Sequence, residues 1–239
     1  MHVQRRMIAS ALALLALVAF GAAGLTHTAS AATNSRIQVV NISDQSFGVA
    51  WFSTGKVASS SIEYGTSCAT ASAKASEMPS DGFAHLAVTS GGLAANTTYY
   101  FKIVSGSSVD SNGGKCYQAR TFPAESLPPP PNGIYGTVRT AGCKSTAPGS
   151  LIIVTVQHKT KTGITTSSTM ATMSSTFSKM SGNWALPFAE ATRVTGAFFS
   201  PAKGDTITFA AASDATHRSS GTVVYDGSST LTGPVKVCV

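Results

Sequence analysis

The chain has 239 residues, of which 43% are hydrophobic and 11% are charged, and its formal net charge is +7. This hydrophobic content excludes disorder driven by net charge, and the absence of any run of basic residues argues against a nucleic-acid partner. A typical domain has about 100–150 residues, so two small domains fit this length better than one or three.

Residues 1–31 have the three parts of a secretory signal peptide. Arg5 and Arg6 supply the positive start, Met7–Phe20 is apolar apart from one serine, and Ala29-Ser-Ala31 forms a small-residue cleavage motif. We expect cleavage and secretion to the cell surface or medium, by the general or the twin-arginine route, which leaves a net charge of +5. The alternative is an uncleaved anchor. No later apolar stretch reaches the roughly 18 residues of a membrane span.

Four cysteines follow the leader: Cys68, Cys116, Cys143 and Cys238. None of them forms a C-x-x-C motif, and export places them in an oxidising compartment, so we expect disulfides. Four cysteines allow three pairings. Two lie on each side of Pro128–Pro131, which favours Cys68–Cys116 and Cys143–Cys238.

The four consecutive prolines at Pro128–Pro131 predict a short polyproline II linker between two domains. We therefore divide the mature chain into a first domain at 34–123, a linker at 124–132 and a second domain at 133–239.

The first domain alternates apolar and polar residues with the period of a β-strand. Phe47–Trp51, Ile62–Tyr64, Leu86–Val88 and Tyr99–Val104 carry this pattern, and turn-forming residues separate them. Short strands with turns every 8–12 residues predict an antiparallel β-sandwich.

Three segments of this domain, in order, resemble a fibronectin type III domain of the bacterial or purple acid phosphatase N-terminal type. They are Ser46–Trp51, Ser61–Ser67 and Leu93–Ile103, although Ala95 stands where that family usually has proline. Trp51 is large and alternates with other apolar residues, so we expect it to be a core anchor. The resemblance implies that Tyr99 forms the tyrosine corner. The metal-binding motifs of the phosphatase catalytic domain are absent from the sequence, so that activity is not implied.

The second domain is also rich in predicted strands, at 134–138, 151–156, 184–188, 205–209, 222–225 and 235–239. Gly133–Val138 and Gly182–Leu186 resemble carboxypeptidase-regulatory-like, transthyretin-type modules, which implies a second, immunoglobulin-like or transthyretin-like sandwich. Thr160–Ser181 holds 13 Ser or Thr in 22 residues, and we expect an exposed hairpin or loop there.

No motif for catalysis or metal binding stands out, and we expect no cofactor, no metal and no enzymatic activity. The three histidines after the leader, His85, His158 and His217, are far apart in sequence. Asp110–Gly114 begins like a calcium loop, but a turn at Asn112-Gly113 explains the same residues. Met170, Met173 and Met180 with His158 leave copper(I) binding as an alternative. A Ser-His-Asp triad assembled by the fold also remains open.

A leader followed by two β-sandwiches without a catalytic motif favours a secreted, non-catalytic surface or matrix module for adhesion, spacing or protein–protein interaction. Its expected partner is a protein or glycan at the cell surface or in the matrix, contacted through the segments at 105–115 and 160–181. The alternatives are a carbohydrate-binding accessory protein of an extracellular hydrolase system and an enzyme with an unrecognised site. Carbohydrate binding needs exposed rings, and the possible ligand contacts are Trp184, Tyr135, Phe198, Phe199 and Tyr225.

Overall fold

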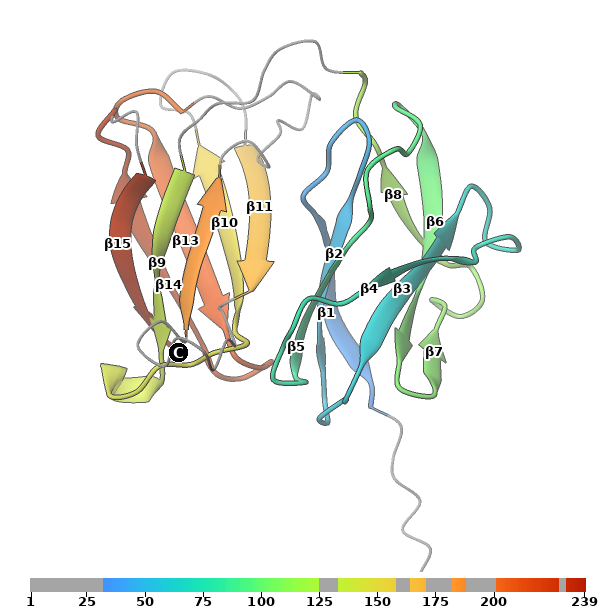
Figure 1. Cartoon of the computed structure of the whole chain (residues 1–239), viewed down its shortest axis with the longest axis horizontal. Coiled ribbons are helices and arrows are strands. Elements are labelled where there is room, and N and C mark those ends of the chain that lie inside the picture. Colours follow the sequence, from blue (N-terminus) through green and yellow to red (C-terminus); the bar gives the residue numbers. More distant parts are fainter. Residues whose placement is uncertain (1–31, 125–132, 158–163, 171–181, 188–200, 228–230) are drawn as a thin grey trace, which may run out of the picture. The chain divides into compact units, whose positions relative to one another are not determined.

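The computed structural model describes residues 32–124, 133–157, 164–170, 182–187, 201–227 and 231–239 (Figure 1). These residues form β-strands and one short 3-10 helix, η1 (Ala141–Cys143). None of the helices among them has the length and apolarity needed to cross a bilayer. The predicted signal peptide and the proline linker lie outside the described residues.

Strands β1 to β8 form the first sandwich, which consists of two antiparallel sheets. One sheet has the order β1-β2-β5, and the other has the order β4-β3-β6 with both β7 and β8 paired to β6. The strands are β1 (Asn34–Val40), β2 (Gly48–Ser53), β3 (Ser60–Gly65), β4 (Ala73–Ser76), β5 (Ala84–Val88), β6 (Thr98–Ser105), β7 (Ser108–Asp110) and β8 (Tyr117–Arg120).

The core of the first sandwich follows the period-2 pattern of its strands. Val49 and Trp51 of β2 point inward and meet Ile62, Phe101 and Ile103 from the opposite sheet, and all five are fully buried. Three inward rows of large apolar side chains therefore close the sandwich, which confirms the predicted role of Trp51.

Tyr99 forms the predicted tyrosine corner at the start of β6. Its ring is buried, and its hydroxyl oxygen accepts a hydrogen bond of 2.9 Å from the backbone N–H of Ala94. This bond fixes the connection that enters β6, although Ala95 replaces the usual proline. Strand order and tyrosine corner together define a fibronectin type III or immunoglobulin-like sandwich.

Strands β9 to β15 form the second sandwich. Its sheets have the orders β11-β10-β13-β14 and β12-β9-β15. The strands are β9 (Gly133–Arg139), β10 (Leu151–Gln157), β11 (Ile164–Met170), β12 (Asn183–Pro187), β13 (Thr206–Ala212), β14 (Arg218–Val224) and β15 (Leu231–Cys238). The core lies between the sheets and includes Ile134, Val154, Leu186, Ile207 and Phe209.

One feature of the second sandwich differs from the sequence-based expectation, and another agrees with it. The pair β9–β15 is parallel, so this sandwich is not wholly antiparallel. Within Thr160–Ser181, where an exposed hairpin or loop was expected, Ile164–Met170 forms strand β11, which pairs antiparallel with β10 and so agrees with the hairpin. Its threonines suit a strand because β-branched side chains fit a pleated surface.

Both predicted disulfides are present. Cys68–Cys116 joins the β3–β4 connection to the residue before β8, and Cys143–Cys238 joins η1 to the end of β15. Each bridge lies within one sandwich, and none of the four cysteines is free.

Candidate functional site

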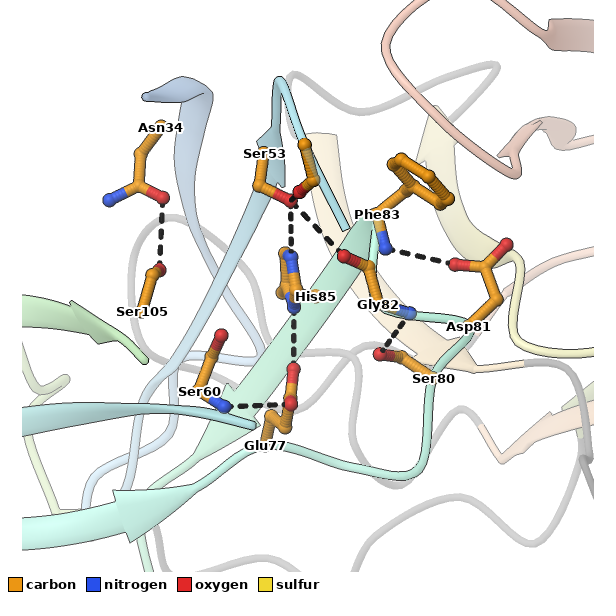
Figure 2. A network of polar contacts seen from close by, with 11 residues as sticks. Asn34, Ser53, Ser60, Glu77, Ser80, Asp81, Gly82, Phe83, His85 and Ser105 are labelled. Carbon is orange, nitrogen blue, oxygen red and sulfur yellow. Dashed lines mark hydrogen bonds and ion pairs between the residues drawn. The ribbon is translucent and has the colours of Figure 1, made fainter. Parts of the chain in front are cut away.

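A chain of polar side chains crosses the interior of the first sandwich (Figure 2). The Oγ of Ser53, the last residue of β2, lies 2.9 Å from Nε2 of His85 in β5. The other ring nitrogen of His85, Nδ1, lies 2.5 Å from Oε2 of Glu77, in the β4–β5 connection. The residue types and their order match those of a serine hydrolase triad.

This arrangement is closed to any substrate. The His85 side chain is fully buried, Ser53 is 2% exposed, and the indole of Trp51 stacks on the imidazole with centroids 5.1 Å apart. The Ser53 hydroxyl also lies 2.7 Å from the carbonyl oxygen of Gly55, which competes for its proton. A nucleophile needs room for a reacting carbonyl, and packing fills that room here.

Glu77 gives this row of hydrogen-bonded side chains its structural role. Its Oε1 accepts a hydrogen bond of 2.8 Å from the backbone N–H of Ser60, the first residue of β3. Because β3 belongs to one sheet and His85 to the other, the carboxylate connects the two sheets near their shared end. We call Ser53, His85 and Glu77 the polar clip.

An exposed loop lies on the edge of the β4-β3-β6 sheet. Strands β7 and β8 both pair with β6, β7 with Ile103–Ser105 and β8 with Thr98–Phe101. The six residues Ser111–Cys116 therefore project from an interrupted edge strand, and we call them the 111–116 loop. Interruptions of this kind protect a sheet edge from pairing with another chain.

Asp110 holds the base of the 111–116 loop. Its carboxylate accepts hydrogen bonds from the Tyr117 hydroxyl at 3.1 and 3.2 Å, from the Asn34 amide at 3.3 Å and from the Asn112 backbone N–H at 3.1 Å. The carboxylate of Asp110, the first residue of the calcium-like motif, is therefore hydrogen-bonded by donors of the protein itself. Burial, the hydrogen bond to Asp110 and the charge of that carboxylate raise the pKa of Tyr117 to about 12.

The backbone of the loop is compact and held from several sides. Asn112, Gly113, Gly114 and Cys116 all have positive φ angles, which agrees with the turn predicted at Asn112-Gly113. The N–H groups of Gly114 and Cys116 donate to the carbonyl oxygen of Ser111. The Cys68–Cys116 disulfide ties the end of the loop to the sandwich.

The side chains that this frame presents are open to solvent. Residues 112–115 are exposed, and Val109 in the adjoining strand β7 is 55% exposed. Val109 is therefore a large apolar side chain that is open to solvent at the base of this loop. The sequence located this loop at 105–115 but did not reveal that β7 and β8 share one partner strand.

The aromatic residues proposed as ligand contacts lie in different places. Trp184 and Tyr225 are 4% and 2% exposed and belong to the core of the second sandwich, so neither can serve as a stacking platform. Tyr135 in β9 is half-buried. Phe198 and Phe199 lie outside the described residues, so for these and Tyr135 carbohydrate contact stays a prediction.

The remaining candidate ligands do not assemble in the part of the chain that the structure describes. No group of three His, Cys, Asp or Glu side chains there could hold a metal ion. His217 lies 2.7 Å from the Asp214 carboxylate in an exposed turn. Burial alone would raise the pKa of Asp214. Hydrogen bonds from His217 and Thr216 have the larger combined effect and hold this pKa well below its ordinary value. His158, Met173 and Met180 lie outside the described residues.

No family model matches the chain, and no curated protein sequence matches it. Among solved structures it is similar to two fibronectin type III domains of chicken tenascin, with 13% identity over 80% of this chain and 99% of that one and a TM-score of 0.27. It is also similar to the Yersinia pseudotuberculosis adhesin InvE (9% identity, 81% and 58% coverage, TM-score 0.24). A third similarity is to the three-domain ectodomain of mouse nectin-like molecule 4 (8% identity, 85% and 65% coverage, TM-score 0.20). At these TM-scores the fold assignment depends on the strand order and the tyrosine corner.

Proposed function

We propose that the protein is a secreted, non-catalytic interaction module that binds a protein at the cell surface or in the extracellular matrix through the 111–116 loop and Val109. The observation that carries this proposal is the loop itself, which is exposed at its tip and fixed at both ends. The domain division at 34–123 and 133–239, with a linker at 124–132, is part of the same proposal.

A fixed loop favours binding for an entropic reason. Ordering a flexible loop on binding costs free energy, whereas a loop already held by hydrogen bonds and a disulfide loses little freedom. Positive φ angles at non-glycine residues, here Asn112 and Cys116, store backbone strain that the surrounding structure must maintain. Exposed loops on a rigid β-sandwich are a frequent location for recognition.

The test is a binding assay with the labelled mature protein on an array of purified surface and extracellular proteins from its source, with a glycan array in parallel. We expect saturable binding to a protein, weakened at least about tenfold by Val109→Ser combined with Lys115→Ala, which corresponds to about 1.4 kcal/mol.

The matched control is Val224→Ser, because Val224 is also an exposed valine, 61% exposed, but lies on β14. Its affinity should stay within about twofold of the wild type. Removal of the loop's disulfide by Cys68→Ser with Cys116→Ser should weaken binding without removing the contact side chains. Equal binding by the loop variant and the control would contradict the proposal, and binding to glycans that Tyr135→Ala abolishes would favour the carbohydrate-binding alternative.

A further inference from the structure

The outer face of the β1-β2-β5 sheet is apolar, which is unusual for the solvent side of a sandwich. Val49 and Trp51 point into the core, so Ala50 and Phe52 point to the opposite face. The register places Leu86 beside Ala50 and Ala84 beside Phe52. An antiparallel sheet with one solvated face normally carries polar residues there. The apolar side chains on this face are instead expected to pack against another surface.

The second sandwich carries a matching patch on the outer face of its β11-β10-β13-β14 sheet. Ile152 and Val154 of β10 point into its core, so Leu151 and Ile153 point outward. Their partners in β13 are Ala212 and Ala210. Further along the same two strands the outer face becomes polar, with Thr155 paired to Thr208. The apolar patch is therefore confined to one end of this sheet.

The two patches belong to one buried cluster. Leu151 and Ala212 are 1% and 8% exposed and group with Ala50, Phe52 and Leu86. Arg36, Gln38 and Arg218 line a groove together with Phe52 and Leu151 of this cluster. An apolar centre with a polar rim is the usual composition of a specific interface. Residues Ala31–Val239 also form one compact unit.

We propose that the outer face of β1-β2-β5 is a docking surface for the Leu151–Ala212 patch of the same chain, so that the two sandwiches move as one rigid body. The occupant of the apolar face is then the second half of the protein, and that face is not available to an external partner. This inference does not depend on what the 111–116 loop binds.

The experiment measures the tumbling of the full mature protein by ¹⁵N NMR relaxation, with sedimentation to establish its oligomeric state. For a docked monomer we expect one rotational correlation time for amides in both halves. Leu151→Glu places a charge in the cluster and should give two separate correlation times, while the core amides of each half keep their native chemical shifts. Thr208→Glu is the control, because Thr208 is exposed on the outer face of the same sheet, and it should leave one correlation time.

The wild-type protein decides the question even if Leu151→Glu fails to fold. Two independent correlation times in the wild type would overturn the proposal. A wild-type dimer that Phe52→Glu converts to monomers with independently tumbling halves would also overturn it, because the occupant would then be a second copy.

Discussion

At the scale of single residues, the polar clip shows how a fold can gather the side chains of a catalytic triad for a structural purpose. Sequence analysis treated His85 as an isolated histidine, because its partners Ser53 and Glu77 lie 32 and 8 residues away. Only the register of β2 with β5 and the path of the β4–β5 connection bring them together. No local pattern contains that information.

Glu77→Ala should destabilise the protein by about 2–4 kcal/mol, because it leaves a buried imidazole and the Ser60 amide without their acceptor. The measurement is urea unfolding of the mature protein. The matched control is Glu63→Ala, which removes a partly exposed carboxylate 3.1 Å from the Lys102 ammonium and should cost less than about 1 kcal/mol. Similar losses in the two variants would contradict the structural role of the clip.

Tyr117 gives a pH-dependent prediction. Its pKa is about 12 in the folded protein against an ordinary value of 10.0, so the folded state keeps a proton that the unfolded state has already lost. This contribution to stability is fully present below pH 10 and disappears as the pH rises to about 12. Asp110→Asn removes the negative charge and should move the pKa of Tyr117 down toward 10.0.

The titration is followed by the ultraviolet absorbance of the phenolate, and the signal of the other tyrosines is subtracted with a Tyr117→Phe variant. An unchanged Tyr117 transition in Asp110→Asn would show that burial alone raises this pKa.

At the scale of elements, alternation of apolar residues located the strands that carry a buried row and missed those that do not. The predicted strand at 151–156 coincides with β10 (Leu151–Gln157), since its inward residues are large and apolar. Strand β4 escaped because only Ala75 of its four residues is buried. Strand β1 escaped because a bulge between Ser35 and Gln38, with a positive φ angle at Arg36, breaks its pattern. The parallel pairing of β9 with β15 depends on contacts between opposite ends of the domain, which periodicity does not record.

The pairing of β13 with β14 depends on a glycine. Gly221 lies directly opposite Phe209, and a Cβ at position 221 would overlap the Phe209 ring, with Cε2 only 2.8 Å away. Gly221→Ala should therefore cost about 1–3 kcal/mol, because a buried ring must leave its position.

The control is Gly55→Ala, where an added Cβ has no neighbour within 4 Å and the φ angle is not positive. That substitution should be neutral or stabilise by up to about 1 kcal/mol, through the lower entropy of the unfolded chain. Thermal unfolding compares the two variants, and a neutral Gly221→Ala would mean that the Phe209 ring has an alternative place to pack.

At the scale of the whole molecule, the division of cysteines by the proline run predicted both disulfides, and short alternating strands separated by turns predicted a protein made of β-sandwiches. The candidate site was predicted only in part: its position at 105–115 followed from turn residues, but its frame of Asp110, Tyr117 and Asn34 depends on the fold. The apolar outer face of β1-β2-β5 was not predicted either. Alternation placed Trp51 on the inner face, but it carries no information about which residues cover Phe52 on the outer face.

The last prediction concerns the coupling of the two halves. The chain has two tryptophans, Trp51 in the core of the first sandwich and Trp184 in that of the second, so single-tryptophan variants made with Trp→Phe report each half separately.

Replacing both Cys143 and Cys238 by serine should destabilise the second sandwich by roughly 4–5 kcal/mol, because the bridge closes a loop of 95 residues. The Trp184 fluorescence transition in urea should then shift to lower concentration. If the sandwiches are docked, the Trp51 transition should shift in the same direction by a smaller amount, because unfolding of the second half uncovers Phe52 and Leu86. A Trp51 transition that stays at its wild-type midpoint while that of Trp184 falls would contradict docking, and an unchanged Trp184 transition would show that the bridge adds little to stability.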